Sequence, residues 1–170
     1  MTEYESTQSS QPAAGAQGAD IGIRFVARLI DHVILSIALF VIIVPLVIGA
    51  MFSDLGSNPF TGGFGVGSIV SGIVSAAIVI GYFAYLESSR GQTIGKMLLS
   101  LRTVGPDGGN PTFEQALKRN LWYALGIFPI LGGLAQLAAA VYIAVTVSNS
   151  PTNQGWHDEF ADTTRVLKTT

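Results

Sequence analysis

The chain has 170 residues, of which 49% are hydrophobic and only 12% are charged. So low a share of charge excludes an ordinary soluble domain and favours an integral membrane protein. The formal net charge of -2 gives no reason to expect nucleic acid as a partner. The absence of cysteine excludes disulfides, thiolate metal sites and cysteine nucleophiles.

Residues 1–19 are rich in Ser, Gln, Ala and Gly, which predicts a disordered tail. This segment has neither a basic region nor a short apolar core, so we do not expect a cleavable signal peptide there. Asp20 is a suitable cap for the helix that follows. The sequence therefore predicts a tail over residues 1–19 and a membrane domain over residues 20–168.

Apolar stretches long enough for membrane-spanning helices predict spans at residues 29–52, 66–87 and 121–147. The expected fold is thus an all-α membrane protein with about three hydrophobic helical segments. The third stretch contains Pro129, which favours a break in the helix. Two topologies stay open: one long third span places the C-terminus outside, whereas a broken or re-entrant arrangement returns it to the cytoplasm.

The basic residues are distributed unevenly between the two connections. Residues 53–68 contain no Lys or Arg, whereas residues 87–120 contain Arg90, Lys96, Arg102, Lys118 and Arg119. The positive-inside rule therefore predicts a cytoplasmic second connection and a cytoplasmic N-terminus in a multi-pass protein of the plasma membrane. Lys96 and Arg119 are expected to face anionic lipid headgroups, although the basic set could serve as a topology signal alone.

The second connection also has local order. Thr112 and Gln115 fit a capping box, and Phe113, Ala116, Leu117 and Leu121 follow at helical spacing. This pattern predicts an amphipathic helix at the cytoplasmic interface. Before it, "GKMLLSLRTV" favours a short strand or an extended segment, and "PDGG" favours a turn.

Three blocks of the sequence together resemble the RDD family of bacterial membrane proteins: "RFVARLID", "GQTIGKMLLSLRTVGPDGGNPTFEQALKRNL" and "GWHDEFADTTRVL". The resemblance implies an integral protein of the bacterial inner membrane, with transport suggested for some members. The family's arginine falls on Arg24 and its two aspartates fall on Asp31 and Asp158. The family pattern often has Gly where this chain has Asp162.

The charges at the head of the first span are unusual, because ionisable residues in a membrane span normally have a partner or a function. Arg24 and Asp31 are two helical turns apart, too far for a close pair. We expect Arg28 to neutralise Asp31 and Asp158 to be the distant partner of Arg24. Alternatively, both arginines are interfacial anchors that serve folding only.

Neither a metal nor a cofactor is expected. His32 and His157 each neighbour an aspartate, but adjacent side chains on a helix point about 100° apart and converge poorly on an ion. The two histidines are more simply explained as hydrogen-bonded or titrating groups that support the cluster. "GQTIGK" lacks the spacing and the terminal Ser or Thr of a phosphate-binding loop, so a tight turn is the preferred interpretation.

Two functions remain open. The first is ion or small-solute transport that uses a cluster of Arg24, Asp31 and Asp158. The alternative is a non-enzymatic membrane adaptor that binds a partner protein or anionic lipid. An enzyme is not expected, because the sequence offers no convergent nucleophile and base. Besides the lipid bilayer, the expected partner is a second copy of the chain or another membrane protein. The reason is that three short spans in one protomer can hardly line a transport pathway.

Overall fold

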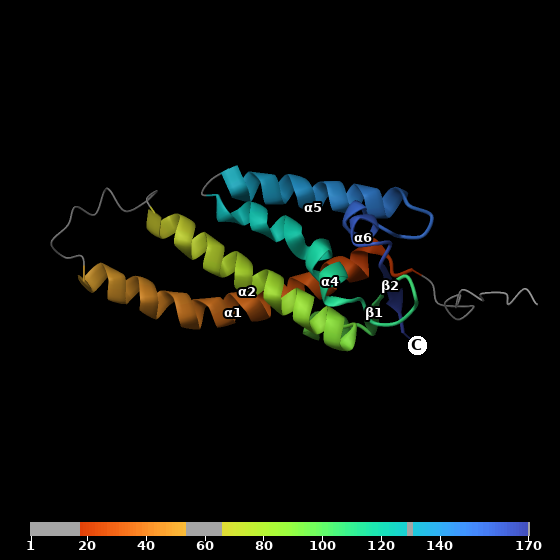
Figure 1. Ribbon diagram of the computed structural model, residues 1–170, viewed down its shortest axis with the longest axis horizontal. Coiled ribbons are helices and arrows are strands. Elements are labelled where there is room, and N and C mark those ends of the chain that lie inside the picture. The colour runs from red at the N-terminus through yellow and green to blue at the C-terminus, as the bar shows by residue number, and fades with distance from the viewer. Residues whose placement is uncertain (1–17, 54–65, 129–130, 170) are drawn as a thin grey trace, which may run out of the picture.

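The computed structural model describes residues 18–53, 66–128 and 131–169, and the side chains of 42–71 lie outside this description. The described residues form mostly helices (Figure 1). In chain order the elements are α1 (Ile21–Ser53), α2 (Val66–Arg90), α3 (Ile94–Leu98), β1 (Leu101–Val104), α4 (Phe113–Asn120), the 3-10 helix η1 (Leu121–Ile127), α5 (Leu131–Asn149), α6 (Trp156–Phe160) and β2 (Arg165–Lys168).

The long helices run side by side and alternate in direction (Figure 1). The α1 helix leads away from the end that holds the small elements, and α2 returns to it. The α4 helix and η1 then lead away again along α2, and α5 returns beside η1. The short strands and α6 therefore lie together at the end where α1 begins.

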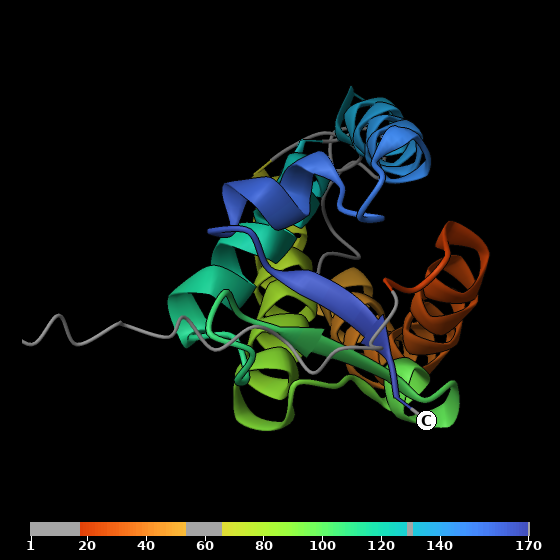
Figure 2. The same cartoon turned by 90° about the vertical axis from the view of Figure 1, so that its right-hand side faces the viewer.

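The prediction of an all-helical fold is incomplete, because β1 and β2 form a two-stranded antiparallel sheet. This sheet lies across the end of the helices (Figure 2). Gly18 and Ala19, which the sequence analysis placed in the tail, belong to the fold: Gly18 bridges to Leu167, and the amide of Ala19 donates to the carbonyl of Val166 at 2.8 Å. The rest of the predicted tail, residues 1–17, lies outside the described residues.

The third apolar stretch is broken, as the sequence indicated. Residues 121–127 form η1 and extend α4, and a separate helix, α5, begins at Leu131. Pro129 itself lies outside the described residues. Gly132 permits the close return, because a Cβ there would overlap the carbonyl oxygen of Leu125. A single span over 121–147 is therefore wrong, and the chain returns to the end where it started.

Within the described residues, two helical segments are long and apolar enough to cross a membrane: Gly72–Arg90 and Leu131–Asn149. The predicted first span, 29–52, is helical within α1, but the side chains beyond 41 lie outside the described residues. The predicted count of three spans is therefore not established.

The capping and turn signals in the second connection are confirmed. The strand predicted over "GKMLLSLRTV" forms only at its end, as β1, because its first part belongs to the helix α3. Gly91 ends α2 with a φ of 70°, and its amide donates to the carbonyl of Glu87 at 2.9 Å. Thr112 and Gln115 form the capping box at the start of α4. Glu114 and Lys118 form the exposed pair at 2.9 Å that their spacing allows.

The α4 helix is amphipathic, but beside Ala116 its buried face carries an ionisable and a polar side chain, while Glu114 is exposed. Arg119 and Asn120 are buried against α2 and α6, whereas Phe113 and Leu117 are exposed. The same inversion holds for α1, where Arg24 and Asp31 are buried and Leu29 is exposed. Apolar side chains outside and ionisable ones inside are the arrangement that suits a lipid environment rather than water.

Candidate functional site: a buried ionic network beside an apolar cavity

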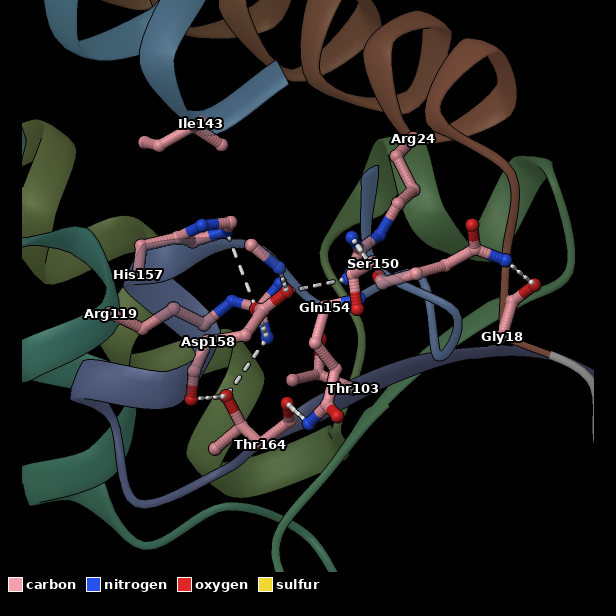
Figure 3. A network of polar contacts seen from close by, with 12 residues as sticks. Gly18, Arg24, Thr103, Arg119, Ile143, Ser150, Gln154, His157, Asp158 and Thr164 are labelled. Atoms are coloured by element: carbon pink, nitrogen blue, oxygen red, sulfur yellow. Dashed lines mark hydrogen bonds and ion pairs between the residues drawn. The ribbon is translucent and has the colours of Figure 1, made fainter. Parts of the chain in front are cut away.

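The carboxylate of Asp158 joins three segments of the chain. Arg24 of α1 donates to its Oδ2 at 2.9 Å, and the Nη1 of Arg119 on α4 lies 2.7 Å from its Oδ1 (Figure 3). The amide of Gly155 adds a bond to Oδ2 at 3.1 Å, because Asp158 lies in the first turn of α6. The predicted pair of Arg24 and Asp158 is thus confirmed, although the two residues are 134 positions apart in the chain.

The environment of Asp158 keeps it ionised. Burial raises the pKa of this carboxyl, but Arg119, His157 and Arg24 outweigh that effect and hold the pKa below its usual range. Arg24 also donates to the carbonyl of Asn153 at 2.8 Å, which fixes the guanidinium in place. The pair is therefore a contact between two charged side chains that joins the start of α1 to α6.

His157 is neutral at physiological pH. Burial lowers the pKa of its imidazole to about 3; the neighbouring Asp158 opposes this, and Arg119 adds to it. Its Nε2 lies 3.3 Å from the Oδ1 of Asp158, which favours a hydrogen on Nε2. The Nδ1 atom is buried and has no hydrogen-bond partner within the described part of the chain.

A second node is the carboxylate of Glu87 on α2. Lys96 of α3 donates to its Oε1, and the Nε of Arg119 lies 3.6 Å from its Oε2. Asn120 donates to Oε2 at 3.2 Å. Arg119 therefore links the two nodes, since its guanidinium contacts both Glu87 and Asp158.

Lys96 and Arg119 are not exposed to the surrounding bilayer, so the prediction that they face its headgroups is wrong. Their side chains are only 4% and 2% exposed. Lys96 also donates to the hydroxyl of Thr103 at 2.6 Å. Burial lowers the pKa of Lys96 to about 7, and the contact with Glu87 opposes this shift. Both cations are buried because they compensate the charge of Glu87, which would otherwise be buried without a partner.

Arg28 is not the partner of Asp31 that its spacing suggested. Its guanidinium lies over the ring of Phe83, 4.2 Å from the centroid, and donates to the hydroxyl of Tyr123 at 3.4 Å. The nearest carboxylate contact is to Glu87 at 3.9 Å. Arg28 therefore belongs to the Glu87 node, where it has weak polar partners and a good aromatic one.

Asp31 forms a separate site in which its described hydrogen-bond partners are neutral. Its Oδ1 accepts from the hydroxyl of Tyr82 and the amide of Gly95, both at 2.8 Å, and its Oδ2 accepts from the hydroxyl of Thr93. The α3 helix lies so close to α1 that a Cβ at Gly95 would overlap the carbonyl oxygen of Ala27. The prediction of a single cluster is thus wrong for Asp31. The segment "GQTIGK" forms a turn and also holds α3 against α1 through the hydrogen bonds of Thr93 and Gly95 to Asp31, a contact that we call the Asp31 clamp.

A cavity of about 450 Å³ lies between α1, α5 and the ionic network. Its lining includes four cationic side chains, Arg24, Arg28, Lys96 and Arg119, and the two histidines. No Asp or Glu of the described residues lines it. The other walls are apolar: Phe25 and Leu29 on α1, and a row of small and branched residues on α5, namely Ala140, Ile143, Ala144 and Val147. Figure 3 shows Ile143 above His157 on the α5 side.

A second, smaller cavity of about 230 Å³ lies next to the first, on the side of Gly72, Gly126 and Gln136. His32 and Tyr123 line both cavities and so form the partition between them. The imidazole of His32 donates from Nδ1 to the carbonyl of Arg28 at 2.6 Å, since a carbonyl can only accept. Beyond the partition, Ser75 and Gln136 supply polar groups.

The sequence matches the model of the RDD family over residues 19–162. The chain belongs to the RDD family. Comparisons with curated proteins and with solved structures gave no match. The family and the two apolar helices together support a membrane protein. The region matched includes the ionic network, the Asp31 clamp and the lining of the larger cavity, apart from Val166.

The sequence analysis of this RDD protein missed Glu87 as a functional residue. Glu87 was assigned to the end of a span, but it follows Phe83 by four residues and therefore shares its buried face. An acid on the buried face of a helix whose other charged residue, Arg90, lies at its end was the signal that could have identified it. Within the described residues, no group of three or more His, Asp or Glu side chains is arranged to hold a metal ion.

Proposed function

We propose that this RDD protein is a membrane transport protein whose substrate carries negative charge. The observation that carries the proposal is the lining of the larger cavity, to which the described residues contribute four cationic side chains and no Asp or Glu. Three of the four are arginines, which stay charged at any physiological pH. Even without Lys96, these arginines outnumber the two carboxylates that contact them, Glu87 and Asp158.

A cation is the less favourable substrate. The carboxylates of Glu87 and Asp158 are fully buried and already contact arginine or lysine, so an incoming cation would have to displace those groups. The carboxylate of Asp31 is fully buried and accepts three hydrogen bonds. An anion, in contrast, adds negative charge where positive charge is in excess.

The second cavity supports movement rather than binding alone. It shares His32 and Tyr123 with the first and offers polar groups of Ser75 and Gln136 farther along the bundle. Rotation of the His32 or Tyr123 side chain would connect the two spaces. We propose this partition as the narrow point of the transport route.

The proposal includes an arrangement in the bilayer. The ionic network lies at the cytoplasmic face of the bacterial inner membrane, and the N-terminus is on that side, because the connection between α2 and α4 is rich in basic residues. The exposed apolar residues of α5 face lipid or a second copy of the chain: Leu131, Leu134, Leu137, Val141 and Val145.

The test is transport by the full-length protein in liposomes, with three probes compared. The probes are radioactive sodium ion, radioactive phosphate and phosphatidylglycerol with a fluorescent headgroup-proximal label, whose movement between leaflets is read by chemical quenching. We expect at least one of the two negative probes to move and sodium not to move. Sodium movement without movement of either negative probe would overturn the proposal.

Arg28→Gln is the variant of choice, because Arg28 lines the cavity but has only a distant contact with Glu87. We expect transport of the negative probe to fall about tenfold or more, which corresponds to a lost charge-assisted contact. Arg165→Gln is the matched control, since Arg165 is exposed on β2. Equal transport by both variants would contradict a role for the cationic lining.

A further inference from the structure

We propose that the larger cavity binds an acidic phospholipid, with the headgroup phosphate on the arginines and part of an acyl chain between α1 and α5. The inference rests on the proposed function, because it names the class of the negatively charged substrate.

The cationic lining has the chemistry that phosphate requires. Arg24 and Arg28 are one helical turn apart on α1, and Arg119 reaches the cavity from α4. Guanidinium groups bind phosphate oxygens through paired hydrogen bonds, and Arg28 has the weakest existing partners of the three. Charge complementarity therefore favours an anionic oxygen group in this position.

The remaining walls argue against a small, fully hydrated anion. A volume of about 450 Å³ would hold about fifteen waters at roughly 30 Å³ each, far more than a single inorganic ion needs. Phe25, Leu29, Ile143 and Val147 line this space, and their side chains offer no hydrogen bonds. An amphiphile uses both parts, because its chain contacts these walls while its charge contacts the arginines.

The cavity continues into the outer apolar surface. Phe25 and Leu29 line it and are also 65% and 53% exposed. Next to them, Val26 and Val33 are exposed on the same helix. A lipid can therefore enter from the side with its chain remaining in an apolar environment throughout.

Three buried polar atoms of the lining residues have no hydrogen-bond partner within the described part of the chain: Nε of Arg119, which has only the 3.6 Å contact with Glu87, Nε1 of Trp122 and Nδ1 of His157. The indole nitrogen is a donor, which suits a phosphate or ester oxygen. The Nδ1 of a neutral His157 with its hydrogen on Nε2 is an acceptor, which suits a hydroxyl. Phosphatidylglycerol supplies both kinds of group in its headgroup, so it is the probe we choose.

The experiment measures thermal unfolding of the full-length protein in detergent micelles with added lipid or salt. Binding to the folded state alone raises the midpoint of unfolding. We expect phosphatidylglycerol to raise it, and phosphatidylcholine or inorganic phosphate at equal concentration to leave it unchanged. An equal shift with phosphatidylcholine would mean that the headgroup is not recognised, which would overturn the inference.

Ala144→Trp separates binding in the cavity from binding on the outer surface, because Ala144 lines the cavity. Ala138→Trp is the matched control: Ala138 is on the same helix but exposed. We expect Ala144→Trp to lose the phosphatidylglycerol shift and Ala138→Trp to keep it. If both keep it, the lipid lies on the outer surface and the inference fails.

The failure of this inference differs from that of the proposed function. If inorganic phosphate alone produces the shift, and Arg28→Gln removes it, the site takes a free anion: the lipid inference fails and the proposed function stands. If phosphatidylglycerol binds in the cavity but no negative probe moves in liposomes, the lipid site stands as a binding site and the transport proposal fails.

Discussion

Asp31 and Asp158 are both fully buried, yet the protein satisfies their carboxylates in different ways. Asp158 contacts Arg24 and Arg119, whereas Asp31 accepts hydrogen bonds from two hydroxyls and one amide. A buried charge that meets cations depends on being charged. Where a buried carboxyl accepts hydrogen bonds only from neutral donors, the stability of the site depends mainly on the shape of the group and on its acceptor oxygens.

The difference assigns the two aspartates different roles. Asp158 holds two cations together, Arg24 of α1 and Arg119 of α4, and both also line the cavity. Asp31 fastens α3 to α1 through Thr93 and Gly95, and Asp31 does not line that cavity. The two aspartates of the family pattern thus have different roles. Asp158 belongs to the ionic network, whereas Asp31 supports it by holding α3 against α1.

The largest expected effect comes from neutralising Asp158. Asp158→Asn leaves Arg24 and Arg119 buried without their shared carboxylate, and loss of one partner in a buried ion pair costs about 3–5 kcal/mol. Chemical unfolding in detergent measures this loss. Asp162→Asn is the control, because Asp162 is exposed and its pair with Lys118 should contribute less than about 1 kcal/mol. Equal losses for both variants would contradict the ionic network.

Gly95→Ala tests the region around Asp31 by disturbing the close packing of α3 against α1. The new methyl group would overlap the carbonyl oxygen of Ala27, so we expect a loss of about 1–3 kcal/mol in the free energy of unfolding. Gly133→Ala is the matched control, since a Cβ there meets nothing and Ala favours a helix. A neutral or stabilising result for Gly95→Ala would show that α3 does not lie against α1 as described.

A pH titration sharpens the comparison within the ionic region. His157 has a folded pKa of about 3 and an unfolded pKa near 6.5, so the unfolded state binds more protons between these values. The free energy of unfolding should therefore fall as pH drops below about 6.5, by at most about 1.4 kcal/mol per pH unit from this group.

The check is the unfolding midpoint at pH 7.5, 6.0 and 5.0 for the wild type and for His157→Gln. The variant should lose less stability than the wild type over this range. An unchanged slope would mean that His157 is not buried in its neutral form.

The smallest effect is expected from Asp31→Asn. Its Oδ1 still accepts from Tyr82 and Gly95, and its new amide group can donate to the hydroxyl of Thr93. We expect a loss of about 1 kcal/mol or less, measured in the same unfolding experiment. A loss as large as that of Asp158→Asn would remove the distinction between the two regions.

The sequence was a good guide where the cause is local. The capping box at Thr112, the turn at Gly91 and the break after η1 follow from the residues themselves. The contact between Arg24 and Asp158 was also foreseen, because a buried arginine needs an acid and the resemblance to a known family named one.

The rest depends on how distant segments pack. Arg28 was assigned to Asp31 by helical spacing, but the ring of Phe83 and the carboxylate of Glu87 lie closer in three dimensions. Lys96 and Arg119 looked like lipid-facing cations because periodicity cannot tell which face of a membrane helix is inside. Lys96 and Arg119 face inward because both contact Glu87 of α2. No local sequence pattern shows that Glu87 lies between α3 and α4.

The most direct test of the account compares Asp31→Asn and Arg28→Gln for movement of the negative probe in liposomes. The account predicts that Asp31→Asn retains transport near the wild-type rate, because the charge of Asp31 is not used, and that Arg28→Gln loses about tenfold or more. The opposite result, with transport lost in Asp31→Asn and retained in Arg28→Gln, would contradict it and make Asp31 the working group.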